Sequence, residues 1–87
     1  MSGGFFNYEQ YHISEIADKV ERLLNHEYDD GEYNYIEGLS EETLAEFRVG
    51  VEALRKAYIY TQRIDWLLSG DDGEESFHRR LKEDLAK

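Results

Sequence analysis

The residue types that bind metals in helical proteins occur together at Glu9-x-x-His12. This spacing places a carboxylate and an imidazole on the same side of a helix. A di-iron site in a helix bundle requires two such motifs and two further carboxylates, and a zinc site without cysteine requires His, Asp and Glu side chains from several helices. Because Glu9 and His12 lie in the first turns of their expected helix and the sequence has no cysteine, we predict no metal site and no cofactor.

The tetrapeptide Asp-Asp-Gly-Glu occurs at residues 29–32 and again at 71–74. A calcium-binding loop requires oxygen ligands at alternate positions and a distal glutamate, and neither copy has this pattern. Asp and Gly are also common in turns and at helix ends. We therefore interpret both copies as turn or cap sequences.

The sequence contains no pattern typical of nucleophilic catalysis. Cysteine is absent, and no serine lies in a Gly-x-Ser-x-Gly motif. Ser2-Gly3-Gly4 lacks the following Gly-Lys-Ser/Thr of a phosphate-binding loop. We predict no catalytic residues and a protein that is not an enzyme.

Four bases lie within one long helical pattern, at Arg48, Arg55, Lys56 and Arg63. In an oligomer, arginines could bind the phosphates of a nucleotide while aromatic rings stack on its base. The residues that would form this ligand site, or an oligomer interface, are Phe5, Phe6, Tyr8, Tyr11, Arg55, Arg63 and Trp66. The alternative, which we favour, is pairing of Arg48 and Lys56 with Glu52 along the helix.

The strongest charge feature is an acidic stretch from Glu27 to Glu46, which holds eight acids and no Lys or Arg. Tyrosines, which are frequent interface anchors, are interleaved with these acids. We predict a partner-binding surface formed by Asp29, Asp30, Glu32, Tyr33, Tyr35, Glu37, Glu41 and Glu42. Such a surface could imitate DNA phosphates or bind a basic protein, and the equally weighted alternative is a solvated acidic loop.

The composition limits the partners and the size of the core. The chain has 87 residues and a net charge of -10, with neither cysteine nor proline. We expect one domain over residues 1–87 with a marginal core, which favours a homo-oligomer, most simply a dimer. Direct binding to nucleic acid or to an anionic membrane is disfavoured by the charge. No apolar stretch is long enough to span a bilayer and the first residues do not resemble a signal peptide, so we expect a cytoplasmic protein.

Apolar periodicity predicts three helices and an all-α fold. The first helix is expected from Asn7, as N-cap with Gln10 as its capping-box partner, to about His26. The second is expected to run for about 28 residues from an N-cap at Ser40 to a C-cap at Ser69-Gly70. A short third helix begins with the capping-box spacing of Asp72 and Glu75.

The first two helices are predicted to form an antiparallel hairpin, in which the second helix is the long central helix of the fold. Residues 1–7 would then be an aromatic N-terminal arm, and residues 27–39 an acidic, tyrosine-rich loop. The arm would lie near Trp66, where its rings could stack on Trp66 and Phe77. The aromatic residues of the opening sequence are therefore expected to close one end of the helices or an oligomer interface.

Two segments near the ends of the chain form distinctive patterns. They are Ser-Gly-Gly-Phe-Phe-Asn-Tyr at 2–8, and Trp-Leu-Leu-Ser-Gly-Asp-Asp-Gly-Glu-Glu at 66–75 followed by Phe77. In these segments the chain resembles a family of short uncharacterised phage and prophage proteins. These segments cover about a fifth of the chain. The resemblance carries no activity, and it implies a small viral accessory protein in the cytoplasm of a bacterial host cell.

These observations lead to three hypotheses. The first is a non-enzymatic phage accessory protein that binds and inhibits a bacterial host or defence protein with a basic surface. The second is an oligomer that sequesters a small nucleotide signal. The third is a structural subunit of a larger assembly.

Overall fold

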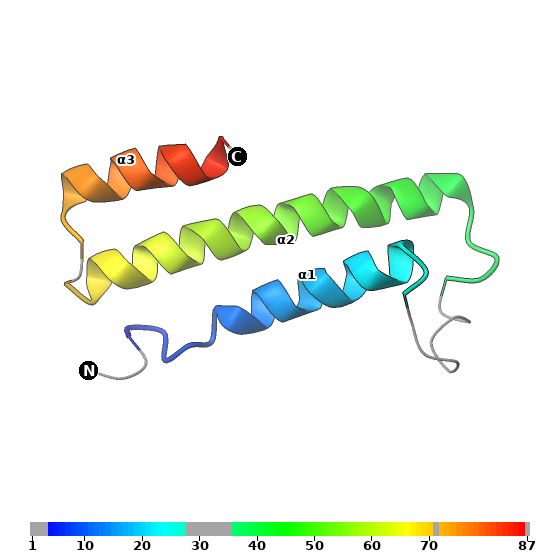
Figure 1. Ribbon diagram of the computed structural model, residues 1–87, viewed down its shortest axis with the longest axis horizontal. Helices are drawn as coiled ribbons and strands as arrows, with labels where there is room; N and C mark the ends of the chain where they lie inside the picture. The colour runs from blue at the N-terminus through cyan, green and yellow to red at the C-terminus, as the bar shows by residue number, and fades with distance from the viewer. Residues whose placement is uncertain (1–3, 28–35, 71, 87) are drawn as a thin grey trace.

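The protein is a flat layer of three helices (Figure 1). The computed structural model describes residues 4–27, 36–70 and 72–86, and no strand occurs within these ranges. Helix α1 (Tyr11–Leu24) and helix α3 (Glu74–Leu85) both pack on the long central helix α2 (Glu41–Leu68). Each connection reverses the chain direction, so neighbouring helices are antiparallel. The predicted all-α hairpin with a short C-terminal helix is confirmed.

The ends of α2 are set by local signals. The Ser40 side chain accepts a hydrogen bond from the Thr43 N–H at 3.2 Å, and Glu41 and Glu42 occupy the first turn, where the helix dipole favours acids. At the other end Gly70 has φ +84°, a left-handed conformation that ends a helix at little cost for glycine. The predicted 28-residue helix is therefore confirmed. No helix in the described part of the chain is long and apolar enough to cross a membrane.

The start of α1 differs from the prediction. Asn7 is not the N-cap, because α1 begins at Tyr11 and Asn7 has φ +55° in a preceding turn. Gln10 does not complete a capping box either, since its side chain donates hydrogen bonds to α2. Contacts with α2 therefore override the local capping signal.

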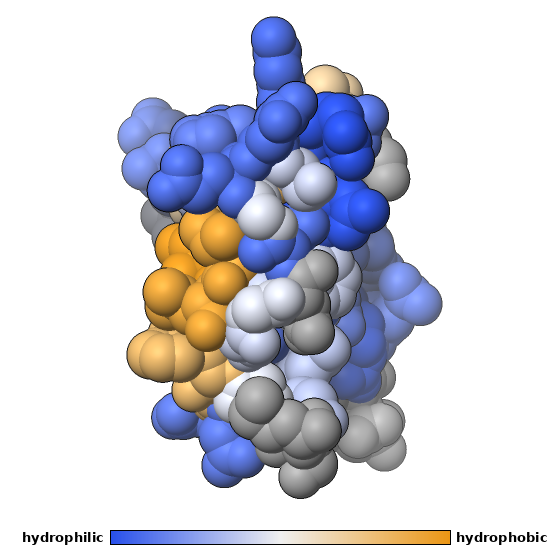
Figure 2. Space-filling view, turned by 90° about the vertical axis from the view of Figure 1, so that its left-hand side faces the viewer, coloured by the Kyte–Doolittle hydropathy of each residue, from blue (hydrophilic) through white to orange (hydrophobic). Residues whose placement is uncertain are grey.

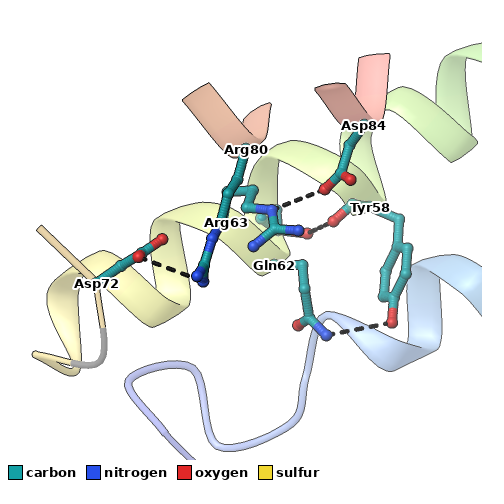
Figure 3. Close-up of polar contacts among 7 residues, drawn as sticks. Tyr58, Gln62, Arg63, Asp72, Arg80 and Asp84 are labelled. Atoms are coloured by element: carbon teal, nitrogen blue, oxygen red, sulfur yellow. Dashed lines mark hydrogen bonds and ion pairs between the residues drawn. The ribbon is translucent and has the colours of Figure 1, made fainter. Parts of the chain in front are cut away.

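The start of α3 also departs from its capping signal. Gly73, and not Asp72, occupies the N-cap position. The Asp72 carboxylate instead faces Arg80 at 3.5 Å, one to two turns along α3 (Figure 3). This ion pair links the connection between α2 and α3 to the exposed side of α3.

The core of the layer is thin. Among the described residues, only Ala17, Ile36 and Val51 are buried apolar residues. No large side chain in the described part of the chain is completely buried. The molecule measures 48 × 27 × 14 Å, which is about one helix diameter in its shortest direction. Helix α2 is covered by α1 and α3 on two sides, and its remaining sides face outward.

Candidate functional site

A buried carboxylate holds the N-terminal arm against the end of α2. Asp65, which is only 4% exposed, accepts a 2.9 Å hydrogen bond from the Phe6 main-chain N–H. It also accepts a 3.2 Å bond from Gln10 Nε2, which in turn contacts Gln62 Oε1 at 2.8 Å. The arm passes so close that a Cβ on Gly4 would lie 2.6 Å from Asp65 Oδ2. A carboxylate near the end of α2 thus fixes a segment at the opposite end of the chain.

A cavity of about 210 Å³ lies at this contact. Its walls combine the Asp65 carboxylate with three aromatic rings and two further polar side chains. The lining residues are Gly4, Tyr8, Gln10, Tyr11, Asp65, Trp66 and Ser69. Of these, the sequence analysis singled out Tyr8, Tyr11 and Trp66 as candidate interface or ligand residues, and the structure brings these three together.

The sequence analysis missed Asp65 and gave Gln10 a different role. One signal for Asp65 was present, because it lies in the last turn of α2 between apolar residues Ile64 and Trp66. An acid in that position opposes the helix dipole, so its presence calls for a tertiary partner. No signal in the sequence identified Phe6 and Gln10 as those partners.

The aromatic residues at the start of the chain make two separate sets of ring contacts. Phe5 and Phe6 meet edge to face with centroids 5.4 Å apart. Tyr8 lies 5.8 Å from Tyr11, which lies 5.9 Å from Tyr58 on α2. The arm therefore lies against the end of the α1–α2 hairpin, but Phe5 and Tyr8 remain more than half exposed.

The two arginines proposed for nucleotide binding are engaged within the chain. Arg63 donates to Asp84 on α3 at 2.7 Å (Figure 3). Its guanidinium also lies 4.6 Å from the centre of the Trp66 ring. Arg55 lies 2.8 Å from both Asp18 and Glu21 on α1. The hydrogen bond to Asp18 is the largest contribution that raises the pKa of Arg55. A phosphate would have to displace these carboxylates, so the geometry does not favour a nucleotide at Arg55 or Arg63.

The described residues of the predicted acidic surface lie at the other end of the hairpin. Asp29, Asp30, Glu32, Tyr33 and Tyr35 lie outside the described residues. The remaining three predicted contacts, Glu37, Glu41 and Glu42, are exposed, as are their neighbours in the stretch, Glu27 and Glu46. Figure 1 places the connection between α1 and α2 at the end of the molecule opposite the N-terminal arm. The acidic surface and the cavity are therefore separate sites.

One side of the hairpin is apolar and uncovered. A groove of about 240 Å³ is lined by Val20 on α1 and by Glu46, Phe47, Gly50 and Leu54 on α2, so all but one of its residues are uncharged. Leu68, which is 53% exposed, lies five helical turns beyond Gly50 and so shares its side of α2. An apolar patch is visible at the end of the molecule that carries the N-terminal arm (Figure 2). This side of the helix layer could pack against another surface.

Comparison with known proteins adds no family or activity. The chain matches no family model, no curated protein and no solved structure. Among the described residues, no three His, Asp or Glu side chains are grouped as a metal site would require.

Proposed function

We propose that this protein is a non-enzymatic accessory protein that binds and inhibits a bacterial protein through its acidic end. The observation that carries the proposal is the uniform charge of the segment from Glu27 to Glu46, which contains no base. In the described part of that segment, all five glutamates are exposed. Such a surface attracts a basic partner and steers its approach.

The expected partner is a host or defence protein that normally handles nucleic acid, because its basic surface would accept an array of carboxylates in place of phosphates. The resemblance of both chain ends to phage proteins supports a bacterial partner and an anti-defence role. Inhibition would then result from occupation of that basic surface. The acidic end acts as a docking surface in this proposal and takes no part in bond making or breaking.

The exposed apolar side supports a homodimer as the binding form. A second copy on the groove beside Gly50 would cover apolar side chains that the thin helix layer leaves in water. Light scattering should give the mass of a dimer for the native protein and of a monomer for Leu68→Lys. Val49→Lys is the matched control, since Val49 is equally exposed but lies about 100° around α2 from Gly50. A native monomer at high protein concentration would overturn the dimer.

The partner can be sought with tagged protein in a bacterial lysate at low and high salt. We expect one dominant host protein that is lost at high salt, because salt screens exposed charges. Reversal of Asp29, Asp30 and Glu32 to Lys should abolish its capture, and the single change Glu37→Lys should weaken it. The matched control reverses Glu9, Glu15 and Glu83, three exposed acids outside the segment. Capture that survives the first triple reversal would contradict the acidic docking surface.

A further inference from the structure

The cavity between the N-terminal arm and the end of α2 has the chemistry of a cation site. Its walls include the nearly buried Asp65 carboxylate and the rings of Tyr8, Tyr11 and Trp66. We propose that this cavity binds a primary alkylammonium group of the kind that ends a lysine side chain. This site is distinct from the acidic docking surface and does not depend on the proposed function.

The surroundings of Asp65 indicate that the ligand of this cavity carries a positive charge. Its two hydrogen bonds come from neutral donors, the Phe6 N–H and the Gln10 amide. No Lys, Arg or His among the described residues pairs with it within 4.0 Å. The C-terminal end of α2 and the N-terminal end of α1 meet here with opposite partial charges, which largely cancel. The carboxylate therefore sets a negative potential that a cation would neutralise.

Arg63 does not fill this role. It lies against the Trp66 ring, but its guanidinium is already paired with Asp84 at 2.7 Å. The pair is close to neutral as a unit. A second cation near Trp66 therefore meets little repulsion from Arg63.

The unused hydrogen-bond acceptors favour a primary ammonium over other cations. Gln10 is 4% exposed, and its Oε1 is buried without a partner among the described residues. The Ser69 Oγ is likewise a buried atom without a partner among the described residues, and Ser69 also lines the cavity. Together with Asp65, three residues that line the cavity carry acceptor oxygens, and an ammonium has three donors. Because Gln10 Oε1 and Ser69 Oγ are closed to water, these two side chains would have to turn toward the ligand to accept its hydrogen bonds. A quaternary ammonium has no donor and could use only the rings.

The aromatic rings suit the rest of an alkylammonium chain. Tyr8 and Tyr11 lie at the cavity wall with exposed faces, and Trp66 lines the same cavity. Methylene groups pack on such rings, and a nearby ammonium is attracted by their π faces. The cavity therefore provides apolar contact, charge and hydrogen bonds together.

Trp66 is the only tryptophan in the chain and lines this cavity, so tryptophan fluorescence reports on the surroundings of the site. The native protein is titrated with n-butylammonium, with n-butanol as the neutral analogue and sodium chloride at equal ionic strength as the salt control. We expect a saturable change with n-butylammonium and none with n-butanol or salt. Tetramethylammonium should bind more weakly. Equal responses to n-butylammonium and salt would overturn the site.

Matched variants locate the binding. Asp65→Asn removes the charge and should weaken n-butylammonium binding by about tenfold, as expected for a lost charged hydrogen bond. Tyr8→Leu should weaken it with the fold intact, because the Tyr8 side chain is 54% exposed. The control is Tyr60→Leu, an exposed tyrosine outside the cavity. Binding that is unchanged in Tyr8→Leu and Ser69→Ala would contradict the proposal even if Asp65→Asn failed to fold.

A lysine peptide and its acetyl-lysine form distinguish two sources of the ammonium group. Binding of the lysine peptide but not of the acetylated one would identify a protein side chain as the ligand. Binding of n-butylammonium alone would identify a small free amine. Reversal of the acids at 29, 30 and 32 should leave both titrations unchanged, so this site and the acidic docking surface can fail separately.

Discussion

The Phe6 main-chain N–H donates a 2.9 Å hydrogen bond to the carboxylate of Asp65, a residue 59 positions further along the chain. This bond joins the N-terminal arm to the end of α2 and forms one side of the cavity. It also explains why the arm contains a glycine at position 4, where the backbone approaches the carboxylate most closely. Replacement of Gly4 by alanine tests how close the arm lies to Asp65.

Gly4→Ala should destabilise the protein by about 1–3 kcal/mol. Gly4 has φ +62°, and an added Cβ would lie 2.6 Å from Asp65 Oδ2. The strained φ and the steric clash would both weaken the contact between the arm and Asp65. Urea unfolding followed by circular dichroism measures the change. Gly73→Ala is the control, because Gly73 has φ -100° and open space around its Cβ position, so that this variant loses only the N-cap preference of glycine over alanine. Equal stabilities for the two variants would show that the arm does not rest on Asp65.

Gly50→Ala should stabilise the isolated chain by about 0.5–1 kcal/mol, because alanine is the better helix former. Gly50 lies inside α2, and an added Cβ would meet nothing within 4 Å. The free energy of unfolding should be measured at low protein concentration, where any dimer dissociates. A loss of stability there would contradict the open surroundings of Gly50.

The ion pair between Arg63 and Asp84 should contribute about 1 kcal/mol to the docking of α3. Arg63 Nε and Asp84 Oδ2 are 2.7 Å apart, and both side chains are largely shielded from water. A double-mutant cycle with Arg63→Met and Asp84→Asn measures the coupling. The control cycle uses Arg80 and Asp72, whose atoms are 3.5 Å apart and whose arginine is more exposed. We expect a smaller coupling energy for Arg80 and Asp72 than for Arg63 and Asp84. A larger coupling energy for Arg80 and Asp72 would contradict the prediction.

Stability should fall at alkaline pH through Tyr58. Burial, with a smaller contribution from Tyr11, raises the pKa of Tyr58 above its ordinary value of 10.0. The folded protein therefore holds this proton more tightly than the unfolded chain does. The stabilisation is present below the unfolded pKa and is lost as the pH rises through the folded pKa.

The measurement compares unfolding free energies at about pH 9 and about pH 11, on either side of the ordinary tyrosine pKa. The native protein should lose more stability over this range than Tyr58→Phe. Tyr60→Phe removes an exposed hydroxyl and should retain the native decline. A decline that is identical in Tyr58→Phe would show that this residue does not control the alkaline behaviour.

Much of the fold could be predicted from the sequence because the signals are local. Apolar residues at steps of three and four predicted the helices, and Ser40 and Gly70 predicted both ends of α2. Helix caps depend on residues a few positions apart, so they can be identified without the rest of the molecule. The start of α1 was predicted wrongly because Gln10 makes its contacts with α2 and not with its own helix.

The choice of partners for charged side chains was decided by the tertiary structure. Arg55 pairs with Asp18 and Glu21 across the hairpin. The sequence analysis favoured pairing of Arg48 and Lys56 with Glu52 along the helix and named no partner for Arg55. Such exposed pairs contribute only a few tenths of a kcal/mol. Because contacts along one helix are weak, the packing of neighbouring helices determines which carboxylate an arginine meets.

The sequence by itself determined three helices, their hairpin order and an acidic stretch without bases. Only the tertiary structure brought Gly4, Gln10 and Asp65 together and left one side of α2 uncovered. Helix formation depends on neighbours within a few residues, whereas the cavity joins groups more than fifty positions apart. Such groups meet only when the chain has folded back on itself, so no local pattern records the site that they form.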